Sequence, residues 1–165
     1  MSEMKRPRYK VEIVTTAFQI TGEVEPVGPW IVYLNNPDRH VVPVHNARAV
    51  PIGVANTAAI DRSLLLVNRA DICLIVLLEA AARESVSMMR HVEVTISHVG
   101  PLICRSEFHM GAEVSLLTFF DDLSGHFFPA TNAEVYPLVT WPRPLPRKID
   151  MVMLNRQQVK LFYNT

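Results

Sequence analysis

Residues 34–52, LNNPDRHVVPVHNARAVPI, return further along the chain as residues 120–138, FDDLSGHFFPATNAEVYPL. The two copies keep one register over their whole length. The matched positions are His40 and His126, Pro43 and Pro129, Asn46-Ala47 and Asn132-Ala133, and Pro51 and Pro137. An internal repeat of this kind indicates two copies of one structural unit.

A second repeated segment follows each copy. Residues 67–72, VNRADI, reappear as residues 154–159, LNRQQV, so that one additional residue separates the two anchors in the second half. The chain of 165 residues thus divides into units of roughly 80 residues, each large enough for a small core. We predict two domains, residues 1–82 and 83–165, with an alanine-rich helix around residues 79–90 that serves as a linker or caps the second domain.

Composition and charge narrow the functional classes. Apolar residues make up 49% of the chain and charged residues 19%, which is typical of a globular protein. The net charge is zero, and each half balances its own basic and acidic residues, which argues against a large polyanion-binding surface. Cys73 and Cys104 lie in apolar segments without CxxC spacing, and this pattern predicts buried, reduced thiols.

The N-terminal segment and the hydropathy pattern predict a cytoplasmic protein. Lys5, Arg6 and Arg8 precede a strand-like alternation and not an apolar run with a cleavage site, so we expect no signal peptide. The most apolar segment, residues 72–78, is far shorter than the roughly 20 residues that a membrane-spanning helix needs. We expect no membrane association.

Each unit reads as a series of short strands. Residues 11–16 and 92–96 open the two units with β-branched alternation. Residues 18–24, 30–34 and 41–44 continue the first unit, and a proline inside the last of these favours an edge or a bulge. Residues 35–38 predict a tight turn, as do 121–125 in the second unit. The apolar segments 64–67 and 72–78 enclose a polar corner at 68–71 that is repeated at 155–158.

About five antiparallel strands per unit, with no room for crossover helices, predict an all-β protein of two tandem small antiparallel β-barrels. A barrel would also remove most of the sheet edges. One β-sandwich built by both halves together is the alternative architecture.

Two resemblances rest on these motifs. The pattern YLN, then R or G, then FxPxxxAxVxPL, then xNRxxI resembles an uncharacterised family of small bacterial proteins known only as a domain of unknown function. In this chain the pattern is carried by residues 33–35, 39, 43, 47, 51, 68–69 and 72, and again by residues 128–129, 133, 135, 137, 155–156 and 159. This resemblance implies no activity.

The polar corner is also similar to that of Sm-like barrels, whose last two strands are joined by the pattern Ile-Arg-Gly-x-x-Val. Here asparagine stands at the arginine position and arginine at the glycine position. The resemblance implies an Sm-like or SH3-like barrel fold, whereas the changed corner puts the RNA binding of that family in question.

The repeated corners supply the main candidate binding residues: Asn68, Arg69, Asn155 and Arg156. In one interpretation asparagine bonds the backbone of the corner and arginine pairs within the fold. In the other, the two arginines present forks to a phosphate or an acidic partner. Arg143 and Arg147, in the proline-rich segment WPRPLPR, are further candidates for binding a partner or belong to a plain loop.

The remaining polar residues indicate structure rather than chemistry. His40 and His126 repeat without ligand spacing to other donors, and Asp121-Asp122 match the uncharged pair Asn35-Asn36 in a turn. No nucleophile with a base, phosphate loop or HExxH pair occurs in the sequence, so we expect neither catalysis nor a cofactor or metal. We predict an interaction or scaffold protein that binds a protein partner or itself. An Sm-like RNA-binding protein is the alternative.

Overall fold

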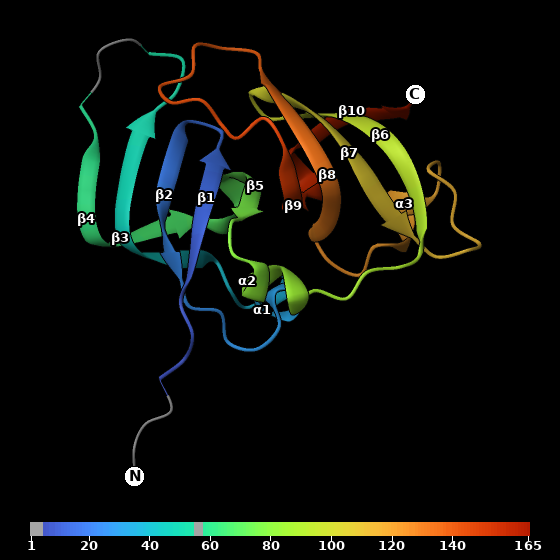
Figure 1. The fold of residues 1–165 in the computed structure, drawn as a ribbon, viewed down its shortest axis with the longest axis horizontal. Helices are drawn as coiled ribbons and strands as arrows, with labels where there is room; N and C mark the ends of the chain where they lie inside the picture. Colours follow the sequence, from blue (N-terminus) through green and yellow to red (C-terminus); the bar gives the residue numbers. More distant parts are fainter. Residues whose placement is uncertain (1–4, 55–57) are drawn as a thin grey trace.

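Short runs of β-branched and aromatic residues form the strands of the computed structural model, which describes residues 5–54 and 58–165 (Figure 1). The first unit contains β1 Tyr9–Thr15, β2 Phe18–Val24, α1 Trp30–Asn35, β3 Val41–Pro51, β4 Ile60–Asn68, the 3₁₀ turn η1 Arg69–Asp71 and β5 Ile72–Leu77. After α2 Ala80–Glu84, the second unit contains β6 His91–Val99, β7 Leu102–Met110, α3 Phe119–Asp122, β8 Phe127–Pro137, β9 Ile149–Asn155, η2 Arg156–Gln158 and β10 Val159–Asn164.

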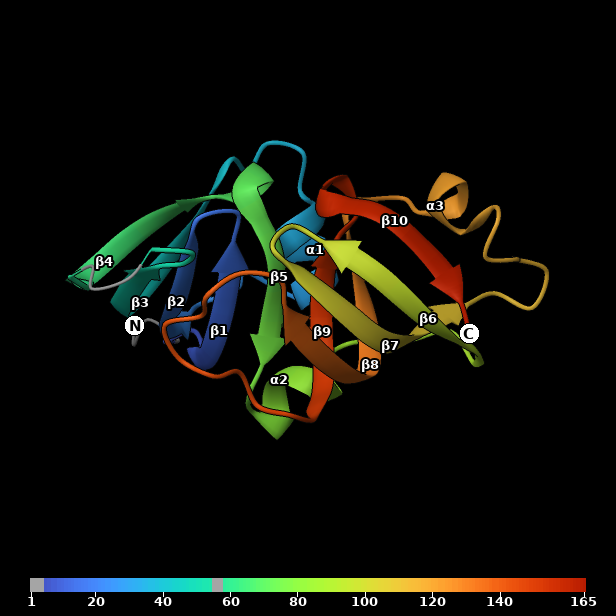
Figure 2. The ribbon, with the colours of Figure 1, turned by 90° about the horizontal axis from the view of Figure 1, so that it is seen from above.

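All ten strands belong to one antiparallel sheet with the order β10-β6-β7-β8-β9-β5-β1-β2-β3-β4. In each unit the fifth strand pairs with the first, and the two units join where β5 pairs with β9. The all-β class predicted from the sequence is confirmed. Within the described residues the sheet is continuous and open, and it forms neither two closed barrels nor two packed sheets. Its edge strands β4 and β10 lie at opposite ends of the molecule (Figures 1 and 2).

The strand predicted at residues 30–34 is wrong, because these residues form helix α1. Pro29 precedes the helix, and Trp30, Tyr33 and Leu34 are buried. This spacing places all three large side chains on one helical face toward the core, and their packing overrides the preference of aromatic and branched residues for strands. In the second unit Asp121 and Asp122, expected in a turn, likewise lie in a short helix, α3.

The predicted linker helix is present but shorter than residues 79–90. Helix α2 spans Ala80–Glu84 and buries only Ala82 among its own residues. Arg83 donates hydrogen bonds to the carbonyls of Leu77 and Leu78, at 3.1 and 3.0 Å, which holds the helix against the end of β5. The remainder of the linker has no regular structure before β6 begins at His91.

The repeated asparagines of β3 and β8 explain why the two copies of the sequence repeat align without an insertion or deletion. Asn46 and Asn132 both have φ of 49°, the left-handed region that asparagine tolerates better than most residues. Each donates a side-chain hydrogen bond of 2.8 Å to a glutamate of the neighbouring strand, Glu23 or Glu107. The ladders shift register at these points, so each asparagine marks a β-bulge that bends its unit.

The proline in each of these strands is tolerated for a related reason. Pro43 pairs with Leu66 of β4, whereas the pairing of β3 with β2 ends at His45. Pro129 likewise pairs with Met153 of β9, and the pairing of β8 with β7 ends at Ala130. Each proline therefore has a partner strand on one side only, which is the local edge position that the sequence predicted.

Candidate assembly interface

The repeated asparagines cap the two 3₁₀ corners. Asn68 Oδ1 accepts a hydrogen bond from the Ala70 amide, and Asn155 Oδ1 accepts one from the Gln157 amide, both at 3.1 Å. Asn155 is buried, and its Nδ2 also donates to the Ile72 carbonyl of the first unit at 2.8 Å. Asn68 is exposed, and its Nδ2 has no acceptor within the described ranges. The two corners are thus alike in backbone capping and differ in whether the asparagine side chain also bonds the other unit.

The arginines of these corners bind main-chain carbonyls of their own unit. Arg69 Nη1 donates to the carbonyls of Leu34 and Asn36, at 3.0 and 2.5 Å. Arg156 Nη1 donates to the carbonyl of Phe120 at 2.9 Å and to that of Leu123 at 3.4 Å. Each guanidinium therefore joins its corner to the end of α1 or α3 through two hydrogen bonds. Gln158 of the second corner donates from Nε2 to the Ala70 carbonyl of the first at 2.7 Å, so the two corners lie side by side where the units meet.

His126 lies close to both arginines. Its Nδ1 is 3.4 Å from Arg156 Nη2. Desolvation, and then the positive charges of Arg156 and Arg69, lower the pKa of His126 below its usual value. The imidazole is consequently neutral near pH 7, as expected beside two cations.

Arg143 lies in the proline-rich loop and ties the second unit to the first. Its Nη2 is 3.0 Å from Oε1 of Glu12, a β1 residue that is 4% exposed. The same carboxylate oxygen accepts a hydrogen bond from Gln19 Nε2. The Gly53 amide donates to the Thr140 carbonyl at 2.9 Å, so the loop crosses the first unit at two points. Arg147 is exposed and forms no ion pair within the residues described.

The junction between the units is a pair of strands buried on both faces. Leu74 pairs with Leu154, Ile75 with Met153, and Val76 with Val152. Leu74 and Val76 of β5 pack into the core of the second unit. Met151 and Met153 of β9 pack into the core of the first unit, where they are 4% and 0% exposed. Each unit thus completes the core of the other.

A paired amide and a glycine reinforce this junction. Asn35, at the end of α1, donates from Nδ2 to the Phe127 carbonyl at 3.0 Å and accepts from the Phe127 amide at 2.8 Å. A Cβ on Gly125 would collide with the Asn35 side chain, and one on Gly100 would collide with the Cys73 thiol. The missing side chain at both glycines permits this close approach of the two units.

The edge strands β4 and β10 carry apolar side chains like those of the junction strands β5 and β9, but on the edge strands these side chains are exposed. On β4, Leu64 is 49% and Leu66 is 60% exposed. On β10, Leu161 is 49% and Tyr163 is 47% exposed. Both strands are apolar on both faces over part of their length, a pattern typical of strands with cover on each side. In the described part of the chain each of them has a partner strand on one side only.

A shallow apolar groove runs beside the β4 edge. It has a volume of about 220 Å³ and lies between the turn that joins β1 to β2 and the last residues of β4. Its lining includes Phe18, Ile20, Leu65, Leu66 and Val67. The groove is therefore continuous with the exposed leucines of the edge strand.

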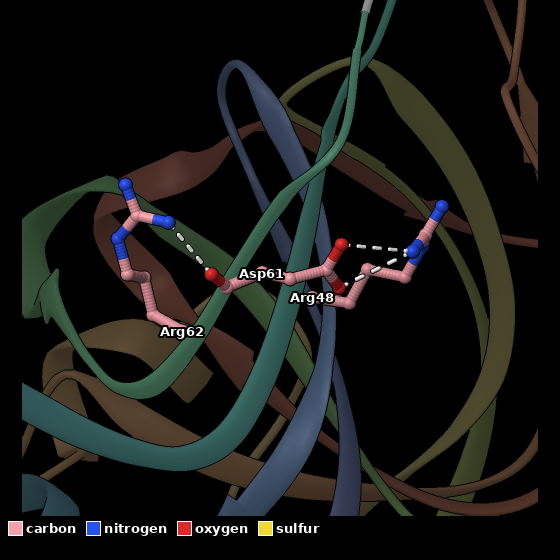
Figure 3. A network of polar contacts seen from close by, with 3 residues as sticks. All are labelled: Arg48, Asp61 and Arg62. Carbon is pink, nitrogen blue, oxygen red and sulfur yellow. Dashed lines mark hydrogen bonds and ion pairs between the residues drawn. The ribbon is translucent and has the colours of Figure 1, made fainter.

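Charged residues mark the beginning of β4. Asp61 carboxylate oxygens lie 3.2 and 3.0 Å from Arg48 Nη1, and the Asp61 carbonyl accepts a hydrogen bond of 2.8 Å from Arg62 (Figure 3). All three residues are exposed. Because charges on an edge oppose the addition of another strand, the region available for pairing is confined to the apolar end, residues 64–67.

The edge residues were not among the candidates predicted from the sequence. The sequence did contain a signal for them, because residues 64–67 and 161–163 lack the alternation of polar and apolar residues that marks a strand with one solvent-exposed face.

Among the described residues no group of metal-binding side chains is found, and no helix there is long and apolar enough to cross a membrane. Comparison with family models, curated proteins and solved structures finds no match to this chain.

Proposed function

We propose that this chain is a non-catalytic interaction protein made of two repeated small β-units, which binds another polypeptide along its open edge strands. The observation that carries the proposal is the exposure of Leu64 and Leu66 on β4 and of Leu161 and Tyr163 on β10. Exposed edge strands with apolar side chains bind extended segments through main-chain hydrogen bonds and side-chain pockets. The groove beside β4 supplies such a pocket.

We further propose that each unit is a variant of the small Sm-like or SH3-like barrel. Three features support this. In each unit the fifth strand returns to pair with the first. A 3₁₀ corner capped by asparagine separates the fourth strand from the fifth in both. The bulges at Asn46 and Asn132 supply the bend that such a unit needs.

Site-specific photocrosslinking in cells of the organism that encodes the protein tests the proposed function. Leu66 or Leu161 is replaced by photoreactive benzoylphenylalanine, and Leu117, which is 91% exposed in the loop before α3 and belongs to neither edge strand, serves as the matched control. We expect covalent polypeptide adducts from positions 66 and 161 and few from position 117. Equal adduct yields at all three positions would refute edge-strand binding.

A further inference from the structure

We infer that the β10 edge of one copy pairs with the β4 edge of a second copy, head to tail, and repeats between chains the junction that β5 and β9 form within one chain. This inference rests on the proposed function and names the partner. It follows from the internal repeat: β5 and β10 are the matching fifth strands, and β9 and β4 are the matching fourth strands. The junction within the chain uses one of each, and in the described residues the complementary strands, β10 and β4, each keep one side without a partner strand.

Exposure at matching positions supports this inference most directly. Leu66 is 60% exposed, whereas its counterpart Met153 is 0% exposed in the internal junction. Leu161 is 49% exposed, whereas its counterpart Leu74 is fully buried. The free edges therefore present apolar side chains at the positions that the internal junction buries.

The internal register fixes the register between copies. Leu74 opposite Leu154 corresponds to Leu161 of one copy opposite Val67 of the next. By the same correspondence Phe162 lies opposite Leu66, and Tyr163 lies opposite Leu65. Leu161 and Tyr163 then face Leu65 and Val67, which line the groove beside β4, much as Leu74 and Val76 fill the core of the second unit.

The free polar groups also match. Asn155 Nδ2 donates to the Ile72 carbonyl across the internal junction. The corresponding contact between copies runs from the unused Nδ2 of Asn68 to the carbonyl of Val159. Asn68 therefore has a role at the interface in addition to capping its own corner.

A charge pair replaces the close approach at Gly125. Where Asn35 meets Gly125 inside the chain, the matching residues between copies are Asp121 and Arg39. Arg39 lies over the Tyr33 ring, with its guanidinium carbon 4.1 Å from the ring centroid, and its buried Nε has no hydrogen-bond partner in the described residues. The Arg39 side chain as a whole is only partly buried, so an incoming carboxylate pairs with the accessible part of its guanidinium. Opposite charges thus align the two copies at the point where the internal junction uses an amide.

Such pairing is heterologous, because the two copies contribute different strands. A pair of copies still has one free β4 and one free β10, so association continues until a ring closes or a filament grows. An isologous dimer, in which each copy uses the same edge, is a different arrangement, and mixing two edge variants distinguishes the two.

The test uses Leu66→Lys, which blocks β4, and Leu161→Lys, which blocks β10, with Leu117→Lys as the control. All three side chains are exposed, so the fold tolerates each change. In sedimentation velocity over a range of concentrations we expect the unmodified protein and the control to associate. Either edge variant alone should associate roughly tenfold or more weakly. A mixture of the two edge variants should form a single heterodimer, because one intact β10 meets one intact β4.

Disulfide trapping tests the register. A mixture of Leu65→Cys and Tyr163→Cys proteins should form mixed disulfide dimers under mild oxidation, whereas Ser63→Cys with Tyr163→Cys, displaced by two residues, should form far fewer. The native thiols do not interfere, because burial raises the pKa of Cys73 to about 12 and that of Cys104 to about 11.

Charge reversal tests the proposed pair. Asp121→Arg should weaken association roughly tenfold or more, and mixing this variant with Arg39→Asp should restore association, because both junctions between the two variants then pair opposite charges. A protein that stays monomeric at all concentrations, or self-association that Leu66→Lys and Leu161→Lys leave unchanged, overturns the inference. If the inference fails in this way but crosslinking in cells still gives adducts to other polypeptides at positions 66 and 161, the proposed function stands without self-assembly. If those adducts are missing too, both fail.

Discussion

The side chain of Asn35 pairs with the main chain of Phe127 through two hydrogen bonds, of 3.0 and 2.8 Å, and so joins the two repeats across 92 residues of sequence. The Asn35 side-chain amide thus bonds both the main-chain N–H and the main-chain carbonyl of Phe127 at the start of β8. The pairing resembles one step of a sheet ladder, although α1 contributes the side chain and not its backbone.

Replacing Asn35 by alanine should therefore destabilise the whole chain. Both main-chain groups of Phe127 lose a partly buried partner, which costs about 1–3 kcal/mol of unfolding free energy. Denaturant unfolding measures the loss. Asp122→Ala, an exposed change at the end of α3, is the control and should shift the stability by less than about 0.5 kcal/mol. Equal effects of the two substitutions would contradict the role given to Asn35.

Replacing Arg69 and Arg156 by alanine tests the two interpretations of the repeated corners. Each guanidinium binds two main-chain carbonyls, so we expect each substitution to lower the unfolding free energy by about 1–2 kcal/mol. Under the alternative, phosphate-binding interpretation the double variant keeps its melting temperature and loses binding to single-stranded RNA. Thermal unfolding together with fluorescence anisotropy at two salt concentrations measures both quantities, because phosphate contacts weaken steeply with salt.

Removing Arg143 should destabilise the contact between the proline-rich loop and the first unit. Arg143→Ala leaves the buried Glu12 carboxylate without its cation, and because the arginine is itself about half exposed we expect a loss of roughly 1–3 kcal/mol. Adding Glu12→Gln should recover part of the loss, since a neutral amide needs no counter-charge. Arg147→Ala, in the same loop, should change stability little. Urea unfolding of the four proteins gives the comparison, and a result in which Arg147→Ala costs as much as Arg143→Ala would refute it.

The buried thiols should make stability fall at alkaline pH. Burial raises the pKa of Cys73 from 9.0 to about 12 and that of Cys104 from 9.0 to about 11. Below pH 9 both states keep these protons. Between pH 9 and about 11 the unfolded chain loses them and the folded chain does not, so rising pH favours unfolding by up to about 1.4 kcal/mol per thiol for each pH unit.

Unfolding free energies of the unmodified protein and of Cys104→Ala over this pH range isolate the contribution of one thiol, because all other titrating groups are shared. The variant should show a shallower decline. Identical slopes would mean that Cys104 titrates alike in the folded and unfolded states.

Local features of the sequence predicted much of each unit. The repeat, the strand segments, the bulge or edge position of Pro43, and the asparagine corners follow from residue chemistry over short spans. Residues 30–34 were mistaken for a strand because aromatic and branched residues favour strands locally. In the folded chain the burial of Trp30, Tyr33 and Leu34 on one face stabilises a helix instead.

Residue patterns alone predict an all-β protein that is built twice from one pattern. The pairing of β5 with β9, the open sheet, and the position of β4 and β10 at its ends emerge only in the folded chain. The physical reason is that neighbouring strands are chosen by long-range pairing and by burial of both faces. Leu66 and its counterpart Met153 are apolar alike in the sequence, yet one is exposed and the other is buried.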